Sequence, residues 1–177
     1  NPEAVQFLVS NGHHIIVESG AGKYSRYNDV DYSEAGAEIA YDREKVFQSN
    51  IILKVAPPTD SEIEMMTGNQ TLISALQLTL QPKETLVSLM RKKITAIAWD
   101  YIQDEHTIFP VVRAMGEIAG NTSILIASEL LSDFKTGKGI MMGGVAGVQP
   151  TEVVILGAGT VGEYACRTAL GLGASVK

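Results

Sequence analysis

The sequence predicts an α/β protein built from two doubly wound parallel-sheet domains, the second of which is incomplete. Two observations predict this class. Short apolar runs alternate with helix-like segments along the first hundred residues, and near the end of the chain an apolar run meets a glycine-rich turn followed by a further helical segment. In open parallel sheets, ligands bind at the carboxyl ends of the strands. Functional residues are therefore expected where the apolar runs end.

Five apolar runs in the first domain have the length and composition of strands. They cover residues 14–17, 37–40, 51–55, 71–76 and 94–99. The third run, IILKV, is almost continuously apolar, which is typical of a central strand covered on both faces. Because helix-like segments separate these runs, we expect parallel pairing, and a helix at the start of the chain implies an earlier strand upstream.

Helix start signals stand between the strand runs. Asn1, followed by Pro2 and Glu3, has the order of an N-cap, a first-turn proline and a first-turn acid. Asp31 and Asp42 are each expected to begin a short helix. Thr59 with an acid three residues later predicts a capping box. Residues 82–93 form an amphipathic pattern and predict another helix.

Two polar side chains fall at the ends of strand runs. Lys54 lies inside the apolar run 51–55, and Gln77 directly follows the run 71–76. One interpretation is that Lys54 extends its ammonium from a strand end to solvent while its methylene stem stays buried. The functional interpretation is that it presents a fixed cation to an anionic or carbonyl substrate.

A long helix is predicted over residues 110–132, and we place the domain boundary at its start. Residues 1–110 are interpreted as a substrate domain that lacks its first strand, and residues 111–177 as an interdomain helix with the beginning of a second domain. Glu117 within the helix is expected to be a paired structural charge. Residues 137–147 contain five glycines and predict a hairpin or clasp packed near the second domain.

The glycines at 157, 159 and 162 have the spacing GxGxxG, between the apolar run 153–156 and a helix predicted from residue 160 to about 172. In a Rossmann-like domain the first glycine permits a sharp turn, the second lets the backbone approach a pyrophosphate, and the third allows close packing of helix on strand. Together with Ala158, Thr160 and Val161, these glycines are the candidate dinucleotide-binding residues. The alternative is a tight strand–helix turn without a ligand.

Composition excludes several classes of function. The formal net charge is −6, and no basic stripe is longer than Arg91-Lys92-Lys93, which disfavours nucleic acid as a partner. No apolar run has the 18 or more residues of a spanning helix, so no membrane association is expected. Cys166 is the only cysteine, which excludes an internal disulfide and favours a buried, inert thiol in a reducing cytoplasm. Asp104, Glu105 and His106 are consecutive and do not predict a metal site.

Several segments together resemble one protein family. They are IILKVAPP, ITAIAWDYIQ, MGEIAGNTS, GKGIMMGGVAGVQP and VVILGAGTVGEYACRTALGLGASV. In this order along the chain, they are similar to alanine dehydrogenase, in the family shared with the NAD-binding subunit of proton-translocating nicotinamide nucleotide transhydrogenase. The resemblance implies a substrate domain and a Rossmann domain closing around a cleft, and usually a homohexamer.

The resemblance also implies roles for particular residues. Lys54 matches the substrate-binding lysine, and Met115 lies where the interdomain helix meets the nicotinamide. Gln77 takes the place of a histidine that is usual in alanine dehydrogenases, and an amide cannot act as a proton donor. Gly116 stands where a serine is common. The family's carboxylate-binding arginine would lie upstream of Asn1, and its catalytic aspartate beyond residue 177.

The resulting expectation is NAD-dependent interconversion of L-alanine with pyruvate and ammonia, with NAD preferred to NADP. Two alternatives remain: the soluble NAD-binding subunit of a transhydrogenase, and a nucleotide-binding module without catalysis. Both ends of the chain are interpreted as cuts in a longer polypeptide. Because half of the nucleotide fold would then be missing, the 177-residue piece alone is expected to be inactive.

Overall fold

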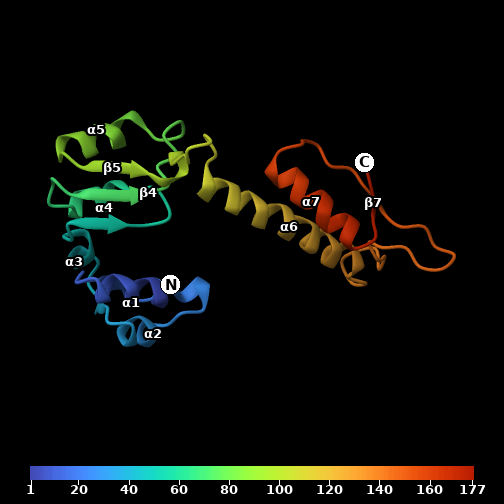
Figure 1. Ribbon diagram of the computed structural model, residues 1–177, viewed down its shortest axis with the longest axis horizontal. Helices are drawn as coiled ribbons and strands as arrows, with labels where there is room; N and C mark the ends of the chain where they lie inside the picture. Colours follow the sequence, from blue (N-terminus) through green and yellow to red (C-terminus); the bar gives the residue numbers. More distant parts are fainter. The chain divides into compact units, whose positions relative to one another are not determined.

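The computed structural model describes residues 1–177, which divide into two compact units, Asn1–Asp100 and Tyr101–Lys177. Figure 1 draws the first unit in blue to green and the second in yellow to red. Each unit combines parallel strands with helices, which confirms the predicted α/β class and the partial second domain. No helix has both the length and the apolar character needed to span a membrane.

All five strands predicted in unit 1 are present, with parallel pairing throughout. They are β1 (Ile16–Glu18), β2 (Glu38–Ala40), β3 (Ile51–Leu53), β4 (Thr71–Ser74) and β5 (Thr95–Ala98). β1 pairs with β2, and a separate three-stranded sheet has the order β3-β4-β5. Since the three strands of this sheet run in one direction, their carboxyl ends lie along one edge (Figure 1).

Unit 1 has five α-helices, of which the first precedes β1 and the other four connect its strands. They are α1 (Pro2–Ser10), α2 (Asp29–Glu34), α3 (Arg43–Phe47), α4 (Asp60–Met65) and α5 (Lys83–Arg91). Asn1 caps α1 and Asp42 caps α3, as predicted. The expected start of α2 at Asp31 is wrong by two residues, because Asn28 is the N-cap and the Asp31 carboxylate closes a capping box with it.

The core of unit 1 lies on one face of the β3-β4-β5 sheet. Its buried members come from the strands and from α3, α4 and α5; they are Phe47, Ile52, Ile63, Met66, Leu72, Leu76 and Leu89. Along β3 only Ile52 is buried, whereas Ile51 and Leu53 are 62% and 74% exposed. The predicted covering of this strand on both faces is therefore wrong within this chain, because the helices contribute side chains to one face only. The predicted central position is also wrong, because β4 is the central strand of the β3-β4-β5 sheet and β3 lies at its end.

Unit 2 is organised around two helices, α6 (Pro110–Ser132) and α7 (Thr160–Gly171). α6 has the predicted bounds. The short strand β6 (Glu152–Val153) pairs in parallel with β7 (Ser175–Val176), which confirms strand, glycine turn and helix in that order. The core side chains come from both helices, from the residue directly before β7 and from the glycine-rich segment; they are Ile124, Met142, Ala165, Ala169 and Ala174.

The glycine-rich segment 137–147 packs on unit 2 only around Met142 and Gly143, and its other residues are exposed. Val145 and Val148 form an antiparallel bridge, and the Thr151 amide donates to the Met142 carbonyl oxygen at 3.0 Å. Met142 itself is buried against α7. A Cβ on Gly143 would lie 2.4 Å from the Leu172 carbonyl oxygen, so this close approach requires a glycine.

α6 and α7 approach each other closely at Gly120. A Cβ added there would lie 2.4 Å from the Val161 carbonyl oxygen and 2.9 Å from the Ala165 amide nitrogen. The Thr168 hydroxyl reinforces the same interface by donating to the Asn121 side-chain oxygen at 2.5 Å. The glycine therefore sets the separation of the two helices.

Substitution of Gly120 by alanine is expected to destabilise unit 2 by about 1–3 kcal/mol, since the added methyl group overpacks a contact made by backbone atoms. Gly171→Ala is the matched control, because it also adds a methyl to a helical glycine but meets nothing within 4 Å. It should stabilise α7 by about 0.5–1 kcal/mol. Chemical denaturation measures both changes, and equal effects would contradict the close approach.

Candidate functional site

The glycine turn of unit 2 has the backbone geometry that a phosphate-binding turn needs. Gly157 has φ +112°, a conformation that side-chain-bearing residues rarely adopt. A Cβ on Gly162 would lie 2.1 Å from the Gly157 carbonyl oxygen, so the helix packs directly against the turn. Gly159, in contrast, faces open space, with nothing within 4 Å of its added Cβ. This is the space that a closely approaching ligand would use.

The start of α7 leaves amide groups available beside this open space. Gly159 is the N-cap and provides no side-chain hydrogen bond to the helix. Its carbonyl oxygen accepts the first intrahelical bond, from the Glu163 amide at 2.9 Å. The preceding first-turn amides, those of Thr160, Val161 and Gly162, have no intrahelical acceptors. They and the helix dipole favour an anion at this position.

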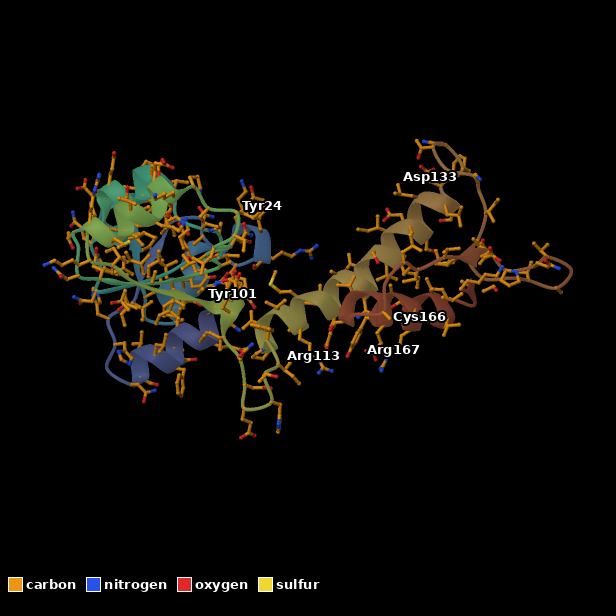
Figure 2. The ribbon with its side chains drawn as sticks, turned by 90° about the horizontal axis from the view of Figure 1, so that it is seen from above. Tyr24, Tyr101, Arg113, Asp133, Cys166 and Arg167 are labelled. Carbon is orange, nitrogen blue, oxygen red and sulfur yellow. The ribbon has the colours of Figure 1, made fainter.

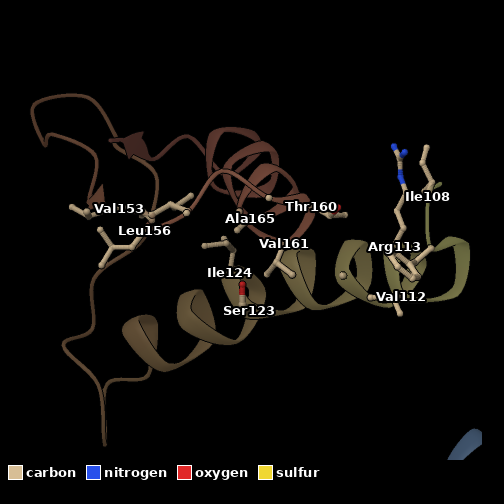
Figure 3. A pocket seen from close by; sticks show the side chains of 17 residues that line it. Ile108, Val112, Arg113, Ser123, Ile124, Val153, Leu156, Thr160, Val161 and Ala165 are labelled. Atoms are coloured by element: carbon tan, nitrogen blue, oxygen red, sulfur yellow. The ribbon is translucent and has the colours of Figure 1, made fainter. Parts of the chain in front are cut away.

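A cavity of about 840 Å³ lies beside the turn, within unit 2 (Figure 3). Its volume is within the range of small-molecule and cofactor sites, roughly 300–1,000 Å³. The lining comes from α6, from the segment after β6 and from the start of α7, and is mostly apolar. It includes all the predicted turn residues except Ala158, and it does not include Met115, which is 50% exposed on α6. The open backbone at Gly159 and this cavity fit a dinucleotide.

Arg113 is a charged lining residue that the sequence motifs did not indicate. It lies near the start of α6 (Figure 2), with Ile108 close by (Figure 3). The Arg113 Nε donates to a Glu117 carboxylate oxygen at 3.2 Å, and this hydrogen bond raises the pKa of the guanidinium. Glu117 is therefore the paired charge that was predicted. Arg113 therefore places a cation among the residues that line a mostly apolar cavity.

A second set of polar residues lies at the carboxyl edge of the β3-β4-β5 sheet, in unit 1. Lys54 directly follows β3, Gln77 lies three residues after the end of β4, and Asp100 lies two residues after the end of β5. The Lys54 amide donates to the Ile73 carbonyl oxygen at 3.0 Å, and the Trp99 indole nitrogen donates to the Lys54 carbonyl oxygen at 3.4 Å. Hydrogen bonds of Lys54 therefore link the end of β3 to β4 and to the residue after β5.

Lys54 does not extend its ammonium into solvent. Its Nζ lies 2.5 Å from Glu62 Oε2 and 3.2 Å from the Pro57 carbonyl oxygen. The side chains of Lys54 and Glu62 are only 18% and 6% exposed. An ammonium has three N–H donors, so these two contacts leave one for another acceptor.

Glu62 is the centre of a larger charge network. Besides Lys54, it accepts from the Arg43 guanidinium at 2.7 Å and from the Thr59 amide at 2.7 Å. Arg43 also pairs with Glu18 at 3.0 Å, so the network holds two cations and two anions. Burial by itself raises the pKa of the Glu62 carboxyl, but the hydrogen bonds from Lys54 and Thr59 outweigh it and hold that pKa below its ordinary value.

Gln77 has an unusual backbone, with φ +47°. Its backbone amide donates to one oxygen of the Asp100 carboxylate at 3.0 Å, and the Leu76 backbone amide donates to the other at 3.1 Å. A left-handed conformation costs a non-glycine residue about 1–2 kcal/mol. A hydrogen bond to a charged group contributes about 1.5–3 kcal/mol, so two such bonds are enough to hold it.

The other candidate residues are not gathered into a site. Asp104, Glu105 and His106 lie in an exposed loop, and no group of three His, Cys, Asp or Glu side chains in the chain could hold a metal ion. Cys166 lies on α7 (Figure 2), is partly buried, and does not line the cavity beside the glycine turn.

The geometry defines an α/β protein with a dinucleotide-type glycine turn in one unit and a polar strand edge in the other. Residues 1–119 match the family described as "Alanine dehydrogenase/PNT, N-terminal domain", and residues 123–177 match "Alanine dehydrogenase/PNT, C-terminal domain". The chain therefore belongs to the alanine dehydrogenase/PNT family, as its sequence segments indicated.

Individual relatives agree with this family. An alanine dehydrogenase from Methanococcus maripaludis is 41% identical over 99% of this chain and 47% of its own length. Alanine dehydrogenase 2 from Staphylococcus aureus is 38% identical over the same shares. The chain thus spans about half the length of the curated relatives it matches.

Two solved structures are similar in fold. An L-alanine dehydrogenase has a TM-score of 0.91 and 35% identity, with 98% of this chain and 48% of that chain covered. A transhydrogenase from Sinorhizobium meliloti has a TM-score of 0.84 and 25% identity, with 99% and 52% covered. Dehydrogenases and a transhydrogenase are thus both among its relatives.

The charge network predicts a specific loss of stability in acid. Because the folded-state pKa of Glu62 is lowered, its contribution is present above the ordinary value of 4.5 and is lost as the pH falls through the folded-state pKa. Glu62→Gln should cost about 1–3 kcal/mol at neutral pH, and the difference from wild type should shrink as the pH falls below about 4.5. Urea unfolding at several pH values measures this.

Glu44→Gln is the matched control, because Glu44 is an exposed glutamate near the start of α3 whose carboxylate contacts only Gln48. It should change stability by less than about 0.5 kcal/mol at every pH. If Glu62→Gln and Glu44→Gln behave alike, the network does not stabilise the unit.

Proposed function

We propose that the protein is an NAD-dependent amino-acid dehydrogenase that interconverts L-alanine with pyruvate and ammonia by hydride transfer. The observation that carries this proposal is the strand–glycine turn–helix geometry, with open space at Gly159, in a chain 41% identical to an alanine dehydrogenase. The turn supplies a dinucleotide site, and the relatives supply the substrate class.

In this proposal the first-turn amides of α7 and the open backbone at Gly159 would hold the cofactor's pyrophosphate. Gly157, Ala158 and Gly162 would shape the turn, and the family resemblance implies that Met115 of α6 would contact the nicotinamide. When bound, the nicotinamide supplies the hydride chemistry, while the protein binds and orients it and keeps water out. The mostly apolar lining of the cavity supports this division of roles.

The substrate is proposed to lie at the carboxyl edge of the β3-β4-β5 sheet. There the remaining N–H of the Lys54 ammonium would anchor or polarise the keto acid, and the Gln77 amide would make a neutral hydrogen bond. The ion pair with Glu62 already orients the Lys54 side chain before a substrate binds. The Gln77 side chain can donate a hydrogen bond but cannot transfer a proton to the substrate, so its proposed role is orientation only.

The alternative is the NAD-binding subunit of a proton-translocating transhydrogenase, which would have no amino-acid substrate. The likeness to the Sinorhizobium meliloti transhydrogenase favours it. Alanine-dependent reduction of NAD by the full-length protein distinguishes the two, since only a dehydrogenase produces NADH from alanine alone. For the dehydrogenase, we propose a cytoplasmic homohexamer on the basis of the family resemblance.

Cofactor binding is tested by Gly159→Ala in the full-length protein. The added methyl meets no protein atom, so stability should be unchanged, but it would occupy the space of the pyrophosphate. NADH should bind at least about tenfold more weakly, a loss of about 1.4 kcal/mol. Gly171→Ala, outside the cavity lining, should bind NADH as wild type does. Fluorescence titration measures both.

Two outcomes would contradict this part of the proposal. If Gly159→Ala binds NADH as tightly as wild type, the turn is not the pyrophosphate site. We expect NAD because the next strand should end in an acidic residue that repels a 2′-phosphate. If wild type binds NADPH more tightly than NADH, this expectation is wrong and the cofactor is NADP.

The substrate residues are tested by unequal losses in the full-length protein. Lys54→Ala removes a charge-assisted contact and should lower kcat/KM for pyruvate reduction by roughly 10–100-fold, whereas Gln77→Ala should cost roughly tenfold or less. Gln77→His restores the residue usual in the family, and a gain in alanine turnover would show that the natural substrate differs. Turnover of Lys54→Ala within about threefold of wild type would restrict Lys54 to its ion pair with Glu62.

A further inference from the structure

Gln77 differs from the other non-glycine residues of positive φ. Those residues are Arg26, Asn69, Lys93 and Thr107. In each of the four, the amide donates to a backbone carbonyl oxygen: Lys23, Lys92, Met90 and Asp104 respectively. The Gln77 amide alone donates to a side chain, the Asp100 carboxylate, which is 23 residues away in the sequence. Among the five residues of positive φ, only Gln77 therefore has its backbone amide held by a side chain.

Both oxygens of the Asp100 carboxylate are used at this point. One accepts from the Leu76 amide at 3.1 Å and the other from the Gln77 amide at 3.0 Å. Asp100 follows β5, whose register with β4 is fixed by four residue pairs from Thr71–Thr95 to Ser74–Ala98. The carboxylate is thus delivered by one strand to the end of its neighbour.

We propose that Asp100 is a positioning residue, which holds Gln77 in the left-handed conformation and so fixes the direction in which its side chain leaves the end of β4. A change of φ from the left-handed to the extended region would turn the Cα–Cβ bond away from its present direction. The inference rests on the proposed function in one respect: it takes Gln77 to be a substrate contact at this edge.

The two hydrogen bonds from the Leu76 and Gln77 backbone amides to Asp100, here called the clamp, require a carboxylate. An asparagine at position 100 has one acceptor oxygen and one NH₂ group, and the NH₂ group would face an amide N–H as donor against donor. Asp100→Asn therefore breaks one of the two bonds at nearly constant side-chain volume. Asp42→Asn is the matched control, because Asp42 accepts a single amide, from Glu44, and asparagine caps helices equally well.

The kinetic test is a double-mutant cycle in the full-length protein. If Asp100 acts through Gln77, Asp100→Asn should lower kcat/KM for pyruvate by about tenfold with NADH affinity unchanged, and in a Gln77→Ala background it should cost less than about twofold. Asp42→Asn should have no effect in either background. An equal loss in both backgrounds would overturn the proposal, since Asp100 would then act independently of the Gln77 side chain.

A second measurement does not depend on any enzymatic activity. In wild-type protein, the backbone amide proton resonances of Leu76 and Gln77 should shift together as the Asp100 carboxylate is protonated, and Asp100→Asn should move at least one of them upfield at neutral pH, because asparagine keeps only one acceptor oxygen. Amides that titrate independently would overturn the clamp. If wild type fails to oxidise alanine while the two amides titrate together, the proposed function fails and the clamp of Gln77 stands.

Discussion

The parallel pairing of β4 with both of its neighbours is the constraint on which the candidate substrate edge depends. β4 aligns Leu72 with Ile52 on one side and with Ala96 on the other. Because all three strands run in the same direction, the residues after each strand fall along one edge. A register shift of one residue would turn the buried side chains of β4 outward. The register that builds the core is therefore the register that places the site.

The charge network around Glu62 stabilises this edge at the end of β3, where Lys54 lies. A carboxylate with a side chain only 6% exposed is costly to bury unless it is paired and hydrogen-bonded. Here two cations and the Thr59 amide satisfy it, and Glu18 balances the second cation. The network joins the end of β3 to the starts of α3 and α4. It holds the Lys54 stem in place without any contribution from a ligand.

How far sequence predicted structure depended on whether the signal was local. Helix caps, the strand runs and the glycine turn are set by residues within a few positions of one another, and these predictions were confirmed in type if not at every boundary. Thr59 and Glu62 were identified as a capping box, but nothing local indicated that Glu62 also binds Lys54 and Arg43. The covering of β3 was overestimated, since an apolar strand does not show what lies on each face.

The left-handed backbone at Gln77 shows the same limit at a single residue. Glycine or asparagine would have indicated positive φ from the sequence, whereas glutamine does not. The conformation follows from a carboxylate 23 residues later, and this is visible only once β4 and β5 are paired. Residue type located the candidate edge, but its geometry required the fold.

These contacts also limit the chemistry that the edge can perform. The Lys54 ammonium is paired with Glu62, and both Asp100 oxygens accept hydrogen bonds from backbone amides. The side-chain amide of Gln77 does not gain or lose a proton in the physiological range. The edge therefore offers a fixed cation and neutral hydrogen bonds rather than a free acid or base. Interconversion of an amino acid and a keto acid moves protons as well as a hydride. If the protein performs the proposed reaction, a group outside this edge or a water molecule must carry those protons, while the edge binds and orients the substrate.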